Sequence, residues 1–286
     1  MSNKSSEFKF VFSCQKWSQD FYQFLETIFH LYPEKKFHDL ISKMSQEHHT
    51  DEEIYKSIQN QLPSIKPFLS EFTLALPSLR KQKKEMSNQV LQLLSNKTNL
   101  NGYLEIGSTG RYISELKKHI DLTGPIYLSN DIEPNYSIAD IFERGQLNYL
   151  GTFIQLNNYQ PIQKNLIPDQ SIDLVTCHIG LHHCPPELLS TYIQSIYRIL
   201  RKDGLFILRD HDVKSSEMAI FVSLVHTVFN LGLNVSWETD FSEFKAFKPI
   251  EEWSQIISKH GFEDTGKRIL QDNDPSLNTL IAFKKN

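Results

Sequence analysis

The chain of 286 residues contains 40% hydrophobic and 22% charged residues, which is enough apolar material for a folded core and excludes a largely disordered protein. Its formal net charge of −4 argues against a protein that binds nucleic acid by electrostatics, so nucleic acid is not an expected partner. No run approaches the roughly 18 consecutive apolar residues of a membrane span, and the start lacks the apolar stretch of a secretory signal. Three cysteines at no disulfide-framework spacing favour a reducing environment, so we expect a cytoplasmic protein without membrane insertion.

The glycines divide the chain into two regions. All 11 of them lie at or after Gly102, so the first hundred residues contain none. Tight turns and close ligand contacts require glycine, which a purely helical region can lack. We therefore expect an α-helical cap over residues 1–98 and a second domain over residues 99–286.

The glycine-free region is predicted to be helical. From Trp17 to Tyr32 the large apolar residues recur with a 3.6-residue period, which predicts an amphipathic helix that ends at Pro33. Thr50 and Glu53, three residues apart, form a capping-box pattern for a later helix. Further helices are expected over 37–44 and 79–94.

The second region alternates strand and helix patterns, which is typical of a parallel sheet with crossover helices. In such a sheet the carboxyl ends of the strands lie at one edge, where ligands bind. Strands are expected over 103–106, 126–128, 152–156, 172–177 and 205–208, and helices over 112–120 and 186–200.

The last part of the chain adds helices and a final pair of strands. An apolar helix over 221–231 lies in an insertion near 214–248, and an amphipathic helix follows over 249–260. Two strand patterns, 262–270 and 277–283, flank a turn-rich stretch, which predicts an antiparallel hairpin at the edge of the sheet.

Chemistry is expected first in the turn after the first strand of the second region. Gly107 and Gly110 allow a sharp turn between a strand and a helix, the place where open parallel sheets bind ligands. Asp131 follows the next strand, 21 residues past Gly110, and a carboxylate there can accept the hydroxyl hydrogens of a nucleoside ribose.

These motifs, in their order along the chain, resemble those of the class I S-adenosylmethionine-dependent methyltransferases over residues 100–286. The glycine-rich motif corresponds to Glu105–Gly107 with Gly110–Tyr112, and the ribose-binding acid to Asp131–Pro134. Segments 168–175, 181–183 and 197–204 continue the match. The resemblance implies a Rossmann-like α/β fold with a seven-stranded, mostly parallel sheet, and S-adenosyl-L-methionine as cofactor with S-adenosyl-L-homocysteine as product.

The resemblance also assigns roles to residues of the cofactor site. Asp131, with Ile132 beside it, would bind the ribose, and Glu105 would hold the loop geometry or bind the amino group. The loop lacks the family's middle glycine and is one residue shorter. The remaining expected cofactor residues are Gly107, Ser108, Thr109 and Gly110 at the methionine end, Asn157 or Asn158 at the adenine, and His178 packed beside the cofactor.

Histidines and cysteines gather in segment 177–184, and Asp210, His211 and Asp212 follow the fifth strand. Removal of a proton from a hydroxyl or amine acceptor suits a histidine, so His182, His183 and His211 are candidate bases. Alternatively, some of these rings only pack or cap a helix, as His178 and His183 can. A metal site is a third interpretation, with His178, His182, Cys177, Cys184 and the Asp210–Asp212 segment, but the spacing matches no standard zinc site and no metal ligand is assigned.

We expect S-adenosylmethionine-dependent methyl transfer to an oxygen, nitrogen or carbon atom of a small or medium-sized acceptor, with a protein acceptor also open. The cap and the insertion would enclose that acceptor. Two alternatives remain: a non-catalytic interaction protein on a methyltransferase scaffold, and a metal-dependent enzyme that uses the histidine, cysteine and aspartate cluster. The sequence carries no prediction of the oligomeric state.

Overall fold

The computed structural model describes residues 6–65, 76–94, 97–137, 140–141, 144 and 146–286. The chain divides into two compact units, each of which is built from several segments. The helical unit comprises Met1–Ser78, Asp212–Phe247 and Gln271–Leu277, and the sheet unit comprises Leu79–His211, Lys248–Leu270 and Asn278–Asn286.

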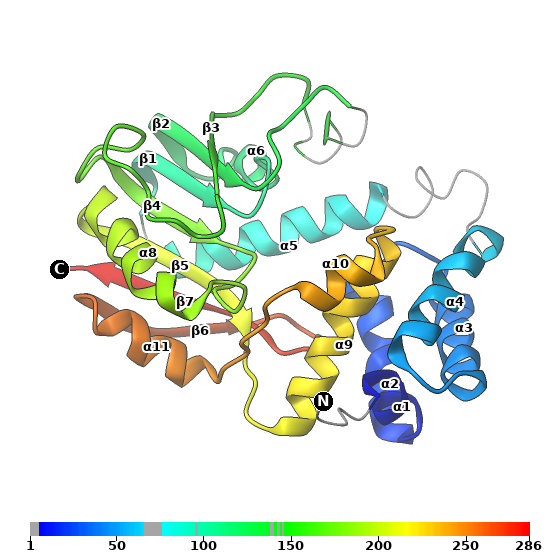
Figure 1. Ribbon diagram of the computed structural model, residues 1–286. Coiled ribbons are helices and arrows are strands. Elements are labelled where there is room, and N and C mark those ends of the chain that lie inside the picture. Colours follow the sequence, from blue (N-terminus) through cyan, green and yellow to red (C-terminus); the bar gives the residue numbers. More distant parts are fainter. Residues whose placement is uncertain (1–5, 66–75, 95–96, 138–139, 142–143, 145) are drawn as a thin grey trace. The chain divides into compact units, whose positions relative to one another are not determined.

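The sheet unit is organised around seven strands in the order β3-β2-β1-β4-β5-β7-β6. All neighbouring strands are parallel except β7, which is antiparallel to both β5 and β6. The predicted mostly parallel sheet with a C-terminal antiparallel hairpin is therefore confirmed (Figure 1). The strands are β1 (Asn99–Ile106), β2 (Asp121–Asn130), β3 (Thr152–Gln155), β4 (Ile172–Cys177), β5 (Leu200–His211), β6 (Phe262–Leu270) and β7 (Asn278–Lys285).

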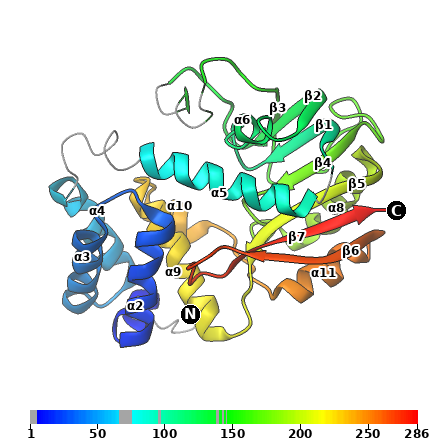
Figure 2. The same ribbon diagram turned by 180° about the vertical axis from the view of Figure 1, so that it is seen from behind.

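Helices cover both faces of this sheet, as the long apolar strands require. Because side chains alternate along a strand, Leu104 and Ile106 enter one core and Tyr103 enters the other. The first core is closed by α8 (Pro186–Ile199) and α11 (Ile250–Ser258), and the second by α5 (Leu76–Leu94) and α6 (Ile113–Leu116). Figure 2 shows the face with α5 and α6.

The helix predicted over 112–120 is wrong in length. It spans only Ile113–Leu116, and the last turn tightens through bonds from Lys118 N to Glu115 O and from His119 N to Leu116 O. The reason is the register of the sheet, because Asp121 already pairs with Asn99 and the chain must be extended by then. The strands β1 and β2 begin earlier than predicted, at Asn99 and Asp121, because polar residues and a glycine separate Leu100 and Leu122 from the apolar runs on which the prediction rested.

The helical unit has an aromatic core of its own. Its helices are α1 (Glu7–Phe12), α2 (Gln15–Phe24), the π-helix η1 (Leu25–Phe29), α3 (Glu34–Glu47), α4 (Asp51–Ile65), α9 (Ser216–Gly232) and α10 (Trp237–Ser242). The predicted capping box begins α4: Glu53 N donates to Thr50 Oγ1 over 3.2 Å, and Thr50 N donates to Glu53 Oε2 over 3.1 Å. Phe221 and Val228 of α9 are fully buried in this core with Phe21 and Ile58. The predicted insertion therefore folds together with the N-terminal helices.

The predicted cap of residues 1–98 ends later than the helical unit, because α5 contributes Met86 and Val90 to the core of the sheet unit. The enclosing role of that cap stays a prediction. Among the described residues, no helix is both long and apolar enough to cross a membrane, and the expected cytoplasmic location stays a prediction too.

Candidate active site

The strand registers of the sheet unit bring four chain segments to one edge. Ile106 of β1 pairs with Ser129 of β2 and with Cys177 of β4, and Cys177 pairs with Leu208 of β5. The residues that follow these strands are therefore neighbours, as is typical of ligand sites in open parallel sheets. They include the glycine loop 107–110, Asp131 and the segment 178–184, and Asp210 lies beside them near the end of β5.

Glu105 lies beneath the glycine loop and is fully buried. Its Oε2 accepts a hydrogen bond from the Tyr103 hydroxyl over 3.0 Å, and its Oε1 accepts one from the Ser108 hydroxyl. Burial raises the pKa of the Glu105 carboxyl, while the bonds from Ser108 and Tyr103 oppose that rise. The carboxylate thus holds the loop from below, and its role toward a cofactor stays a prediction.

Ser108 closes the shortened loop with its side chain. Its hydroxyl donates to Glu105 and accepts from the backbone N–H groups of Gly110, over 3.1 Å, and of Arg111, over 3.0 Å. A hydroxyl offers one hydrogen and two lone pairs, so all of its hydrogen-bonding capacity is used. Gly107 packs so closely on Ile179 that an added Cβ would lie 2.1 Å from Ile179 Cγ2.

Two buried polar side chains beside this loop lack a hydrogen-bond partner among the described residues: the Thr109 hydroxyl and the His178 imidazole, at both ring nitrogens. The His178 ring packs on Tyr112, with 4.3 Å between the ring centroids. Burial lowers the pKa of His178 to about 3, and the positive charges of Arg209 and Arg111 act in the same direction. His178 is therefore neutral at ordinary pH, and the edge offers unused donors and acceptors to a polar ligand.

The residues expected at the ribose and adenine lie after β2 and β3. Asp131 is exposed and Ile132 is 71% exposed, so both are accessible. Asn157 and Asn158 adopt left-handed backbone conformations, and Asn157 lines a pocket of about 90 Å³ beside β3. Tyr159 continues this left-handed turn, and its hydroxyl donates to the carbonyl of Gly180 over 3.2 Å. The turn is thereby tied to the loop that follows β4.

A histidine and an aspartate pair across the ends of β4 and β5. His182 Nδ1 lies 2.8 Å from Asp210 Oδ1, and both side chains are almost completely inaccessible. The same carboxylate accepts the backbone N–H groups of Leu181, over 2.9 Å, and His211, over 2.8 Å. Burial raises the pKa of the Asp210 carboxyl to about 6 against the opposing effect of the His211 charge.

Gly180 makes room for this pair. An added Cβ would lie 2.4 Å from His182 Nδ1 and 2.9 Å from Asp210 Oδ2, and the φ of Gly180 is +78°. Any side chain at this position would push the imidazole and the carboxylate apart, and the backbone conformation itself favours glycine.

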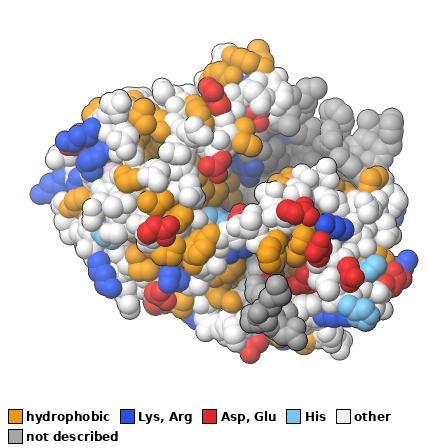
Figure 3. Space-filling view, viewed as in Figure 1, with side chains coloured by type: hydrophobic (Ala, Val, Ile, Leu, Met, Phe, Trp, Pro, Cys, Tyr) orange, Lys and Arg blue, Asp and Glu red, His pale blue; other side chains and the backbone are white. Residues whose placement is uncertain are grey.

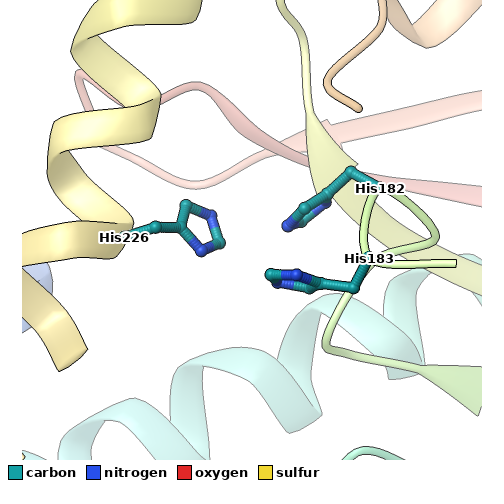
Figure 4. A group of neighbouring side chains, drawn as sticks. All are labelled: His182, His183 and His226. Atoms are coloured by element: carbon teal, nitrogen blue, oxygen red, sulfur yellow. The ribbon is translucent and has the colours of Figure 1, made fainter. Parts of the chain in front are cut away.

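The other two candidate bases lie beside His182. The centroid of the His182 ring is 4.2 Å from that of His183 and 5.7 Å from that of His211. Figure 4 shows the rings of His182 and His183 on the loop after β4; His226, also drawn there, belongs to α9 of the helical unit. The structure therefore brings all three sequence-predicted histidines together at one edge.

The two cysteines considered for a metal site do not join this group. The Cys177 and Cys184 thiols are buried and contact the carbonyls of Gly180 and Pro185. Among the described residues, neither thiol belongs to a group of three metal-binding side chains with mutually close donor atoms, and Asp212 falls in the helical unit.

From the sequence alone, Asp210 was expected only as a candidate metal ligand, and no role was expected for Gly180 or Tyr159. The order of Gly180, His182 and Asp210 along the chain carries a signal only once the neighbouring β4 and β5 are known to end at the same edge.

Comparison with known proteins finds one matching family model and several solved structures of similar fold. Residues 104–208 match a family model described as a methyltransferase domain. No curated protein matches the sequence. The CurJ carbon methyltransferase is 15% identical, with a TM-score of 0.52 over 94% of this chain and 70% of that chain. The 1,6-didemethyltoxoflavin-N1-methyltransferase of Burkholderia thailandensis, solved with S-adenosylhomocysteine, is 13% identical, with a TM-score of 0.48 over 71% of this chain and 78% of that chain.

Proposed function

The chain carries the domain and the fold of a class I S-adenosylmethionine-dependent methyltransferase, and from this premise we propose that it methylates an oxygen, nitrogen or carbon atom of a small or medium-sized acceptor. The observation that carries the proposal is the pair of buried, unpartnered polar groups, Thr109 and His178, beside the closed glycine loop. Buried polar groups normally have partners, so their location at the carboxyl edge indicates a ligand with polar atoms.

The residues at this edge suit S-adenosylmethionine. Its amino-acid end carries charged groups, which the backbone of Gly107–Gly110, the Thr109 hydroxyl and the neutral His178 ring would bind. The exposed Asp131 carboxylate would accept the ribose hydroxyl hydrogens, with Ile132 packed beside it. Asn157 or Asn158 would contact the adenine, and Glu105 keeps the loop in shape. When bound, the cofactor supplies an electrophilic methyl group on a sulfonium centre.

The acceptor is proposed to be a small molecule, with a protein as the second possibility. The net charge of −4 does not attract a polyanion. On the face shown in Figure 3, acidic and basic side chains are interspersed among the coloured residues, without a broad basic surface. Catalysis would depend mainly on the alignment of the two reactants and on the exclusion of water. His182, His183 and His211 are the side chains available to take a proton.

Calorimetric titration of the full chain with S-adenosylhomocysteine tests the proposal. We expect saturable binding, and for Asp131→Asn an affinity at least about tenfold lower, because a charged hydrogen-bond acceptor is lost. Asp121→Asn is the matched control, since Asp121 is an exposed aspartate at the opposite end of the same strand, and it should bind like the wild type.

Two results would count against the proposal. A folded wild-type protein that binds neither S-adenosylmethionine nor S-adenosylhomocysteine would favour a non-catalytic scaffold. Equal affinities of the Asp131→Asn and Asp121→Asn variants would remove Asp131 from the ribose site.

A further inference from the structure

The contact between His182 and Asp210 fixes the chemistry of the imidazole. A carboxylate can only accept, so His182 Nδ1, 2.8 Å from Asp210 Oδ1, carries the hydrogen. In the neutral ring the other nitrogen, Nε2, is then an acceptor with a lone pair. A ring held in this tautomer can take up a proton at Nε2 without rearrangement.

The carboxylate of Asp210 is itself held in place. The N–H groups of Leu181 and His211 donate to its two oxygens, so it cannot rotate away from the ring without losing these bonds. Gly180 keeps the space between the two groups free of side-chain atoms. A simple ion pair needs no such arrangement, whereas an imidazole of fixed tautomer does.

His182 lies in a group of histidines at this edge. The rings of His183 and His211 lie 4.2 Å and 5.7 Å from the His182 ring by centroid distance, and the charges of both lower the pKa of Asp210 against the effect of burial. The charge of Asp210 also adds to the effect of burial in raising the pKa values of the Cys177 thiol and the Tyr159 hydroxyl.

We propose that His182 is the general base of this methyltransferase, that Asp210 is its positioning residue, and that the acceptor is therefore a molecule whose reacting oxygen, nitrogen or carbon atom carries a proton that must be removed. This rests on the proposed function. The bond from the acceptor atom to its hydrogen breaks and the proton moves to Nε2 of His182. The electron pair stays on the acceptor atom and forms the bond to the methyl carbon, as the electron pair of the carbon–sulfur bond passes to sulfur. The proton on Nε2 is later released to water.

The first test reads the tautomer directly and needs no cofactor. The measurement is a long-range ¹H–¹⁵N correlation spectrum of the ¹⁵N-labelled full chain, in which the signals that are missing from the His182→Gln variant are assigned to His182. When neutral, His182 should be in the Nδ1–H form. Asp210→Asn should lose this preference, because an anionic acceptor is replaced by a neutral group that can both donate and accept. His119→Gln is the matched control, since His119 is a half-exposed histidine of the same unit.

The second test measures turnover with S-adenosylmethionine and four named probes. Phenol, tyramine and acetylacetone carry a proton on the reacting atom, whereas benzoate at neutral pH does not. For a probe of the first kind, His182→Gln and Asp210→Asn should each lower kcat about 100-fold or more, with KM changed less than about threefold, and His119→Gln should leave both unchanged. Turnover should rise with pH through about 6 as Asp210 ionises.

The outcomes separate the two proposals. Calorimetry should show that His182→Gln and Asp210→Asn bind S-adenosylhomocysteine as tightly as the wild type does. If the wild type and both variants fail to bind it, the proposed function is wrong. A neutral His182 in the Nε2–H form would overturn the inference whether or not a probe reacts. Methylation of phenol, tyramine or acetylacetone at the wild-type rate by His182→Gln would overturn it as well, whereas benzoate, which has no proton to lose, should react equally fast with both proteins.

Discussion

The buried imidazole of His178 makes the stability of the sheet unit dependent on pH. Burial lowers its pKa from 6.5 to about 3 in the folded chain, and Arg209 and Arg111 contribute. Between these two values the unfolded chain binds a proton that the folded chain does not. Stability therefore rises with pH across this window, and the contribution is lost as the solution is acidified from pH 6.5 towards pH 3.

The size of the effect follows from the two pKa values. The full difference is equivalent to about 5 kcal/mol, and between pH 7.5 and pH 4.5 it amounts to about 2.5 kcal/mol. We expect urea unfolding, followed by circular dichroism, to show a drop in the free energy of unfolding over this range that is about 2.5 kcal/mol larger for the wild type than for His178→Gln. Other titrating groups are common to both proteins and cancel in the comparison.

His119→Gln is the control, because His119 is half-exposed, and its pH dependence should match that of the wild type. If His178→Gln loses stability in parallel with the wild type, the imidazole is not held neutral in the folded chain. The interpretation of His178 as an unused polar group at the cofactor edge would then be wrong.

Two further predictions concern Gly180 and Ser108 at the same edge. Urea unfolding at pH 7.5 measures the free energy of unfolding for both. Gly180→Ala should lower the free energy of unfolding by about 2–4 kcal/mol, because of the positive φ and the close contacts with the histidine–aspartate pair. Gly266→Ala is the control: with φ of +73° and no neighbour within 4 Å, it should lower the free energy of unfolding by about 1 kcal/mol. Equal losses in the two variants would refute the steric argument. Ser108→Ala should cost about 2 kcal/mol and weaken S-adenosylhomocysteine binding, because it leaves buried partners unsatisfied. Ser114→Ala, which loses only a 3.5 Å contact, should change stability by less than about 0.5 kcal/mol; a similar loss in both serine variants would contradict the closing role of Ser108.

The sheet could be predicted from sequence because its signals are local. Strand and helix periods alternate after residue 100, and Asp131 and the glycine loop stand where strands end, so the neighbourhood of the cofactor residues follows from topology alone. The partner of α9 could not be predicted in this way. Its apolar residues, such as Phe221, indicate burial but do not say against what, and the structure buries them with helices nearly 200 positions earlier in the chain.

The polar network of the site was hidden from sequence for a different reason. Glu105 and Asp210 are each the penultimate residue of a strand, and the sequence offers no means to tell an inward-facing carboxylate from an accessible one. The structure turns Glu105 under its own loop and Asp210 towards His182, whereas Asp131 stays exposed. The difference lies in side-chain direction along the strand, which depends on the register and not on residue type.

Gly180 joins the two parts of the site. Its carbonyl accepts the Tyr159 hydroxyl over 3.2 Å, which fixes the left-handed turn that begins with Asn157 after β3. Its missing side chain leaves the space in which His182 meets Asp210. A shift of the turn 157–159, which is proposed to contact the adenine, would therefore act on the carbonyl of Gly180, and the histidine–aspartate pair packs against the same residue. Since packed interiors transmit small displacements, the position of this turn and the geometry of the proposed proton acceptor His182 are linked through one residue of the backbone.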